Sequence, residues 1–131
     1  MALLSARALP PVLSAINTDG IKLTMLMTTK GSLLGCAGET IFDTTGKEVT
    51  RKAIAAIVSN IWSDFCDNDV QSLEFLSMTM DLGTVLLGKV CNDFLVCCVA
   101  RSNIPDGLVK LKLKKLCCHL EGELSKLKLD S

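Results

Sequence analysis

A chain of 131 residues is long enough to form one domain around a single hydrophobic core. Its net charge is zero and it has no tyrosine, so it lacks both the surplus of basic residues and the aromatic platforms typical of nucleic-acid binding. Hydrophobic residues make up 49% of the sequence, which is more than so short a chain can bury. We expect the excess apolar surface to contact a partner.

The seven cysteines are an odd number and contain no Cys-x-x-Cys spacing, although they include the adjacent pairs Cys97–Cys98 and Cys117–Cys118. Zinc sites use spaced cysteine pairs with further Cys or His ligands, and His119 is the only histidine. Neighbouring residues of a strand point to opposite faces, so Cys97 and Cys98 cannot easily bind one ion. We expect reduced, buried cysteines in an intracellular protein, with neither a metal nor a cofactor.

The start of the chain does not resemble an export or membrane signal. Pro10 and Pro11 interrupt its mildly apolar sequence, and the second residue is alanine, not the glycine that myristoylation requires. The chain also has no apolar run of roughly 18 residues, the length that spans a bilayer. These features predict that any membrane association is indirect.

The elements begin with a short helix after Pro10 and Pro11, residues that suit a first helical turn. Residues 21–28 alternate apolar and polar side chains as a strand does, and a turn at Thr29–Gly31 leads to a second strand over residues 32–38. Residues 39–46 are predicted to be a loop. Thr45 and Glu48 have the spacing of a capping box, which would open a helix over residues 49–66.

Three more strands are predicted over residues 73–80, 84–91 and 94–100, separated by turn residues at 81–83 and 92–93. Beyond Pro105, apolar residues recur every three or four positions and predict a final helix. Its apolar stripe consists of Val109, Leu113, Leu116, Leu120, Leu124 and Leu127. The order αββαβββα predicts an α+β domain with a five-stranded, mainly antiparallel sheet.

The central helix predicted over residues 49–66 has an apolar arc of roughly 180°, wider than the ~100° that covers one sheet. Ile54, Ile61 and Phe65 lie at the centre of this arc and are expected to pack on the chain's own sheet. One flank carries small residues that would let a second helix approach closely. The expected partner-facing residues of that flank are Ala53, Ala56, Ile57, Asn60 and Asp64. The opposite flank is extended by Trp62, Ala55 and Cys66. The alternative is that the whole arc is core.

Patterns that suggest catalysis are incomplete. Gly46–Lys47 resembles the end of a phosphate-binding loop, but Ile41 stands where its first glycine belongs and Glu48 where Ser or Thr must bind magnesium. Cysteines 117 and 118 and histidine 119 fan apart by about 100° per residue on a helix and do not form a nucleophile–base pair. A cluster of lysines fits the solvated face of a helix, or contact with an acidic partner or anionic lipid. It consists of Lys110, Lys112, Lys114 and Lys115. We therefore predict a binding protein without catalytic residues.

Several groups of residues together suggest a protein family, and the most specific of them is Ser59–Trp62, preceded by Ala56–Ile57. Further characteristic residues lie in the first helix and hairpin: Ala8–Leu9, Val12–Ser14, Asn17–Thr18, Gly20, Gly31–Leu34 and Gly38. Others lie along the last three strands: Leu73, Phe75, Met78, Val85, Val90, Leu95, Cys97 and Ala100. This combination, spread over about residues 8–125, resembles the Roadblock family. The loop at 39–47 is longer than is usual in that family and the link at 66–73 is shorter.

The resemblance implies a single Roadblock/profilin-like domain over residues 1–131, with its core at about 8–125. Members of the family pair through antiparallel central helices and through their third strands. It therefore implies a second contact at a strand edge made of Leu73, Phe75, Leu76, Met78 and Met80.

Within the family, the match is to subunits of Ragulator-type scaffolds. It implies a non-enzymatic adaptor that forms a heterodimer with a second Roadblock-fold subunit, is held by a lipidated scaffold subunit and docks Rag-type small GTPases. The implied location is the cytosolic face of late endosomes and lysosomes, in amino-acid signalling to TOR complex 1 and in MAPK scaffolding.

Two other interpretations stay open. One is a Roadblock homodimer that acts as a dynein light chain or regulates a small GTPase. The other is a profilin-like enzyme or ligand-binding domain, which is disfavoured because no polar cluster converges in the sequence.

Overall fold

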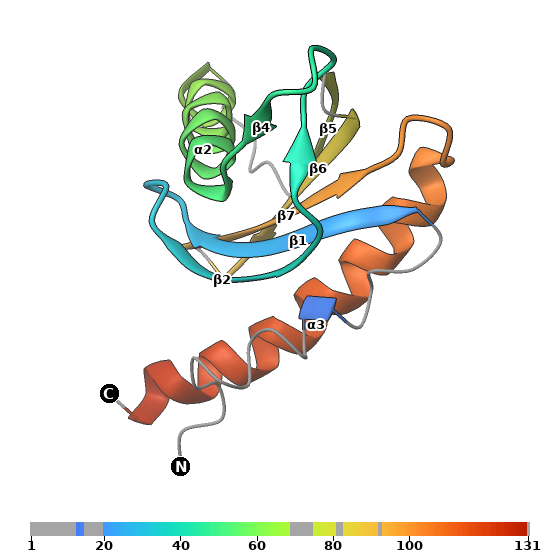
Figure 1. Ribbon diagram of the computed structural model, residues 1–131. Coiled ribbons are helices and arrows are strands. Elements are labelled where there is room, and N and C mark those ends of the chain that lie inside the picture. Colours follow the sequence, from blue (N-terminus) through green and yellow to red (C-terminus); the bar gives the residue numbers. More distant parts are fainter. Residues whose placement is uncertain (1–12, 15–19, 69–74, 81–82, 92, 131) are drawn as a thin grey trace.

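The computed structural model describes residues 13–14, 20–68, 75–80, 83–91 and 93–130. Five strands form one antiparallel sheet in the order β2-β1-β7-β6-β5, which confirms the predicted α+β fold. The strands are β1 (Ile21–Thr28), β2 (Leu33–Gly38), β5 (Phe75–Met80), β6 (Gly83–Val90) and β7 (Phe94–Ala100). Helix α2 (Arg51–Asn68) lies on one face of the sheet and helix α3 (Asp106–Asp130) on the other (Figure 1).

Several predictions fall outside the described residues. Of the first predicted helix, only Leu13 and Ser14 are described, and both are helical. Leu73 and the turn residues Asp81, Leu82 and Asn92 lie outside the described ranges, as do the side chains of Cys66, Leu124 and Leu127.

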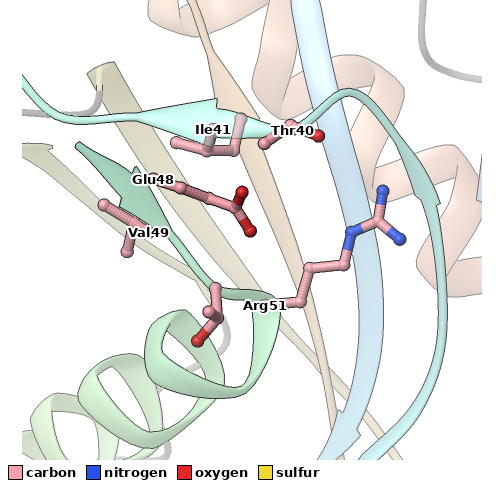
Figure 2. Close-up of a pocket in the computed structure, with 6 residues that line it drawn as sticks. Thr40, Ile41, Glu48, Val49 and Arg51 are labelled. Carbon is pink, nitrogen blue, oxygen red and sulfur yellow. The ribbon is translucent and has the colours of Figure 1, made fainter. Parts of the chain in front are cut away.

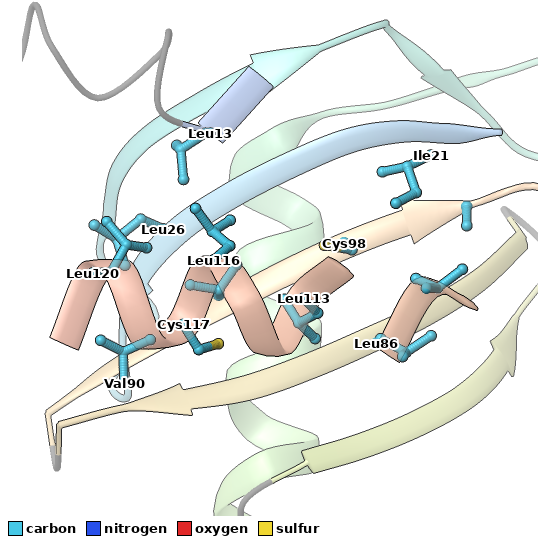
Figure 3. Close-up of a cluster of buried hydrophobic side chains, with 13 residues drawn as sticks. Leu13, Ile21, Leu26, Leu86, Val90, Cys98, Leu113, Leu116, Cys117 and Leu120 are labelled. Carbon is cyan, nitrogen blue, oxygen red and sulfur yellow. The ribbon is translucent and has the colours of Figure 1, made fainter. Parts of the chain in front are cut away.

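The strands alternate their side chains between two apolar faces of the sheet. On β7, Cys97 belongs to the buried cluster that α2 covers, whereas Cys98 belongs to the cluster that α3 covers. This confirms that the two thiols point apart. Figure 3 shows the cluster on the α3 side, where side chains from the helix meet those of β1, β6 and β7.

Helix α3 packs through the predicted stripe, because Val109, Leu113, Leu116 and Leu120 are all buried. Gly88 on β6 makes this close packing possible. A Cβ atom at position 88 would lie 2.8 Å from the Cys117 sulfur and 3.1 Å from the Phe75 ring. The helix therefore approaches β6 at a position without a side chain.

The predicted turn at Thr29–Gly31 is confirmed as the link between β1 and β2. The Thr28 N–H donates to the Ser32 carbonyl at 2.9 Å, and the Gly31 N–H donates to the Thr28 carbonyl at 3.0 Å. Gly31 has φ +98°, a conformation that favours glycine. A Cβ at this position would also lie 2.7 Å from the Ser59 hydroxyl, so α2 passes close to the turn.

The predicted start of the central helix is wrong by two residues, and so is its cap. Helix α2 begins at Arg51, and Thr50 is the capping residue because its hydroxyl accepts a hydrogen bond from the Ala53 N–H at 3.1 Å. The capping box at Thr45 and Glu48 does not form. Glu48 instead lies in the short strand β4 (Glu48–Val49), which pairs with β3 (Ile41–Phe42).

The predicted loop at residues 39–46 thus contains strand β3, which forms a small hairpin with β4. Asp43 organises the turn of this hairpin. The Asp43 carboxylate accepts hydrogen bonds from the Thr45 hydroxyl at 2.5 Å, the Thr45 N–H at 2.9 Å and the Lys47 N–H at 3.0 Å. These bonds, the Thr45 hydroxyl first, lower the pKa of Asp43. The sequence signal for this turn was Asp43 followed by Gly46, which adopts a positive φ.

Candidate partner-binding surface

The buried side of α2 is turned further toward Trp62 than the sequence predicts. The side chains that the sheet buries are Ile54, Ala55, Val58, Ser59 and Trp62. Of the three residues expected at the centre, Ile54 is buried and Ile61 is half-buried, whereas Phe65 is 49% exposed, so the prediction is wrong for Phe65.

Two features explain this rotation. Trp62, the largest side chain of the helix, is buried in the core, and Ser59 tolerates burial because its hydroxyl donates to the Ala56 carbonyl at 3.0 Å. At the first turn, the Arg51 guanidinium donates to the Gly38 carbonyl at 2.8 Å and to the Cys36 sulfur at 3.3 Å. Arg51 therefore ties the start of the helix to β2.

These contacts also establish which flank of α2 faces which edge of the sheet. Ser59 lies against Gly31 in the β1–β2 turn, and Arg51 reaches β2. The flank that carries Ile57 and Ile61 is on the opposite side of the buried stripe. It is therefore turned away from the β1–β2 turn.

All five central-helix residues expected to face a partner are exposed: Ala53, Ala56, Ile57, Asn60 and Asp64. Ile57 is 41% exposed, although it is a large aliphatic side chain. Ile61 and Phe65 follow it at four-residue intervals and extend the same apolar row. Sequence reasoning assigned these two residues to the core, yet their spacing from Ile57 was visible in the sequence.

Strand β5 ends the sheet, and no described strand lies beyond it. Its residues Leu76, Met78 and Met80 are half-buried and pack against the cluster on the α2 face. Phe75 faces the other side, where it packs with the α3 cluster and the Lys110 ammonium lies 5.6 Å from its ring centre. The predicted edge thus divides between two faces, and three of its described residues lie on the same face of the sheet as α2.

We use the term α2–β5 surface for the combined set of exposed and half-buried apolar side chains Ile57, Ile61, Phe65, Leu76, Met78 and Met80. Between Lys52 and Asp64 the helix carries no charged residue. Exposed apolar side chains and an unpaired sheet edge are each typical of a protein–protein contact.

Two pockets lie among the described residues. One is an open hollow between the β3–β4 hairpin and the start of α2, lined by Thr40, Ile41, Glu48, Val49, Thr50 and Arg51 (Figure 2). A second is lined by Phe75, Lys89, Lys114, Cys117, Cys118 and Glu121. His119 is exposed and lines neither pocket.

The buried thiols are poor nucleophiles and poor ligands. Burial raises the pKa of Cys98 to about 12, partly offset by the Thr24 hydroxyl 3.9 Å from its sulfur. Burial also raises the pKa of Cys117 to about 12 and that of Cys97 well above its usual value. Within the described ranges, six cysteines are free thiols and no three His, Cys, Asp or Glu side chains are grouped to hold a metal.

No helix in the described part of the chain has the length and apolar character to cross a bilayer.

No protein-family profile matches the chain. A curated relative, the Ragulator complex protein LAMTOR2 homolog of Caenorhabditis elegans, is 24% identical over 119 residues, which is 91% of each chain. Among solved structures, Myxococcus xanthus MglB aligns with a TM-score of 0.80 at 15% identity, over 97% of this chain and 95% of that one. A Roadblock/LC7 domain from Streptomyces avermitilis gives 0.74 at 10% identity, over 88% and 97%.

Profilins, the other group named in the predicted fold, are structurally less similar to this chain. Acanthamoeba castellanii profilin IA aligns with a TM-score of 0.53 at 14% identity, over 87% of this chain and 97% of that one. The helix and strand arrangement is thus that of Roadblock/LC7 domains, and the sequence similarity extends to a Ragulator subunit. The resemblance to the Roadblock family is confirmed: this chain has the Roadblock/LC7 fold and is similar to LAMTOR2-type proteins.

Proposed function

We propose that this protein is a non-enzymatic adaptor subunit of a Ragulator-like complex, and that it forms a heterodimer with a second Roadblock-fold protein. The observation that carries the proposal is the α2–β5 surface, which combines exposed apolar side chains of one helix with the last strand of the sheet, on the same face. The similarity to a Ragulator LAMTOR2 homolog supports the same assignment.

The chemistry of the surface favours a folded partner with a similar helix. The small exposed residues Ala53 and Ala56 allow a second helix to approach, while Ile57 and Phe65 supply apolar area to bury. The edge of β5 offers backbone groups that a strand of the partner can pair with. A partner that presents a helix and a strand in the same arrangement covers both parts at once, as a second Roadblock domain would.

The heterodimer is proposed to act at the cytosolic face of late endosomes and lysosomes. There a lipidated scaffold subunit holds it, and it docks Rag-type small GTPases for amino-acid signalling to TOR complex 1 and for MAPK scaffolding. The support for this finer assignment is the similarity to the LAMTOR2 homolog over 91% of the chain.

The test is affinity purification of the tagged full-length chain from its own cells, followed by mass spectrometry and measurement of the mass of the complex. The proposal expects a second Roadblock-fold protein in equal amount, together with a lipidated subunit and Rag-type GTPases. Recovery of the chain alone as a stable monomer would contradict it.

A second candidate is a self-associating Roadblock protein, such as a dynein light chain or a small-GTPase regulator. The observation in its favour is the likeness to a solved structure described as "MglB with tetrameric arrangement", with a TM-score of 0.75 at 15% identity. In the same experiment, a complex containing only copies of this chain would favour this candidate over the heterodimer.

A further inference from the structure

The outer face of α3 carries apolar side chains that the sheet does not cover. Val109, Leu113 and Leu116 are buried against the sheet, whereas Leu108 is 38% exposed and Leu111 is 52% exposed. The two exposed leucines are three residues apart and therefore lie on the same side of the helix, one turn from each other. They form an apolar ridge that points away from the body of the protein.

This ridge lies within a run of positive charge. From Gly107 to Leu120 the sequence contains four lysines and no acidic residue. Lys110, Lys114 and Lys115 are exposed, and the Lys110 ammonium is near the Phe75 ring at 5.6 Å, on the side of the helix that faces β5. Lys115 follows Leu111 by four residues and so continues the line of the ridge. Apolar and basic side chains thus share one outward surface.

Such a surface matches the boundary layer of an anionic membrane. Leucine side chains enter the layer between headgroups and acyl chains, while lysines keep their stems along the apolar surface and their ammonium groups at the phosphates. Each basic residue near a negatively charged bilayer adds to the attraction, which extends about one Debye length. Helix α3 has both components in one described segment.

An acidic peptide is the main alternative occupant, and the neighbouring pocket disfavours it. That pocket, lined in part by Phe75, Lys89 and Lys114, also contains Glu121. The Glu121 carboxylate accepts a hydrogen bond from the Cys91 N–H at 3.3 Å, which holds a negative charge at the site. A carboxylate-rich segment seated in the pocket would meet this charge, whereas a bilayer would rest mainly on Leu108, Leu111 and Lys115, which lie outside the pocket lining, with Lys114 at its border.

We propose that the outer face of α3, around Leu108, Leu111, Lys114 and Lys115, is a peripheral contact site for anionic phospholipid bilayers. The site is on the face of the sheet opposite α2, so a partner on α2 leaves it open (Figure 1). It adds a weak direct contact to the indirect membrane association expected from the sequence, and it does not depend on the proposed function.

The test is flotation of the full-length chain with vesicles of phosphatidylcholine, alone or mixed with phosphatidylserine. Floating protein is bound to vesicles, while aggregated protein sediments, so the two are distinguished. The chain is expected to float with the mixed vesicles and not with phosphatidylcholine alone, and added salt is expected to release it. Lys114→Gln and Lys115→Gln should each lower the partition coefficient about fivefold. Leu111→Ser should lower it roughly tenfold.

The matched control is Lys52→Gln, which removes an exposed lysine from α2 on the opposite face and should leave the partition coefficient unchanged. Failure of the wild-type chain to float with the mixed vesicles would overturn the proposal. Equal losses for Lys52→Gln and Lys115→Gln would do the same, since binding would then follow total charge. If Leu111→Ser binds normally while poly-glutamate displaces the chain, the face belongs to an acidic protein and the proposal is also wrong.

Discussion

Helices α2 and α3 cover opposite faces of one sheet, and each leaves large apolar side chains exposed. Only α3 surrounds these side chains with lysines. On α2, Ile57 is exposed within a stretch from Ala53 to Ser63 that has no charged residue. On α3, Leu111 is exposed between Lys110 and Lys112. Exposure alone does not distinguish these two surfaces, whereas their charge does.

The difference follows from what each kind of partner does to water. A tightly packed protein interface removes water, and a lysine buried there without a partner group would be costly. A membrane surface stays hydrated around its headgroups and attracts ammonium groups. The uncharged stretch of α2 from Ala53 to Ser63 therefore suits a folded protein, and the lysine-rich face of α3 suits an anionic surface.

The largest expected effect separates the two sides of α2. Trp62 is buried while Phe65, three residues later, is 49% exposed. Trp62→Ala should lower the free energy of unfolding by about 3–5 kcal/mol, because it leaves a cavity in the core. Phe65→Ala should change it by less than about 1 kcal/mol. Urea denaturation of both variants checks this. Equal losses would show that Phe65 is part of the core, as the sequence pattern suggested.

The corresponding pair on α3 is Leu113 and Leu111. Leu113→Ala removes a fully buried side chain and should cost about 2–4 kcal/mol of unfolding free energy. Leu111→Ala changes an exposed side chain and should alter stability by roughly 0.5 kcal/mol or less. Thermal melting of the two variants provides the measurement. A large loss for Leu111→Ala would mean that the exposed ridge packs inside the protein, and would remove the basis for the comparison of surfaces.

Introducing a charge on α2 tests whether its exposed apolar side chains bind the partner. Ile57→Arg should leave the melting temperature nearly unchanged, since an exposed helical site accepts arginine. It should weaken binding to the α2 partner by about 2 kcal/mol or more, because the charge would be buried in the interface. Ser63→Arg places the same side chain on an exposed, polar position of α2 and serves as the control. Co-purification with the partner is measured for both. Normal binding by Ile57→Arg would assign the partner to another surface.

Much of the fold could be predicted because local patterns and burial agree. The alternation in residues 21–28 and the glycine turn at Gly31 placed the first hairpin, and the stripe from Val109 to Leu120 placed the buried side of α3. The orientation of α2 was harder, because its arc of apolar residues is wider than the sheet can cover. Which part of such an arc is buried depends on tertiary contacts such as those of Arg51 with β2, and these are not encoded in helical spacing.

The same reasoning applies to the candidate site. The exposed positions Ala53, Ala56 and Ile57 were predicted from the residues on one flank, and they are exposed in the structure. The contribution of Ile61 and Phe65 was missed because a central position in an apolar arc was equated with burial. The β3–β4 hairpin was also missed, since two-residue strands give no periodic signal and the capping-box spacing at Thr45 and Glu48 occurred by chance.

A smaller effect concerns the start of α2, which sets how the helix is presented to a partner. Thr50→Ala removes the side-chain oxygen that accepts a hydrogen bond from the Ala53 N–H. The free energy of unfolding should fall by about 1 kcal/mol, the usual value for loss of an N-terminal cap. Thr50→Ser keeps the acceptor and should restore most of this stability. Thr45→Ala removes a hairpin hydrogen bond to Asp43 and no helix cap, so a loss from Thr50→Ala that Thr50→Ser does not restore would contradict the assignment of Thr50 as the cap.

The smallest effect is the pH dependence of the hairpin that leads into α2. Hydrogen bonds from the Thr45 hydroxyl and from backbone N–H groups lower the pKa of Asp43 in the folded protein below its ordinary value of 3.8. The folded state therefore binds this proton less readily than the unfolded state. The hydrogen bonds to Asp43 stabilise the folded protein above pH 3.8. This stabilisation is lost as the pH falls through the lowered pKa that Asp43 has in the folded state. Asp43→Asn should be slightly less stable than the wild type at neutral pH, and the difference should shrink in acid. Urea midpoints of both proteins across the acid range measure it, and a difference that grows as the pH falls would show that the Asp43 carboxylate does not stabilise the hairpin.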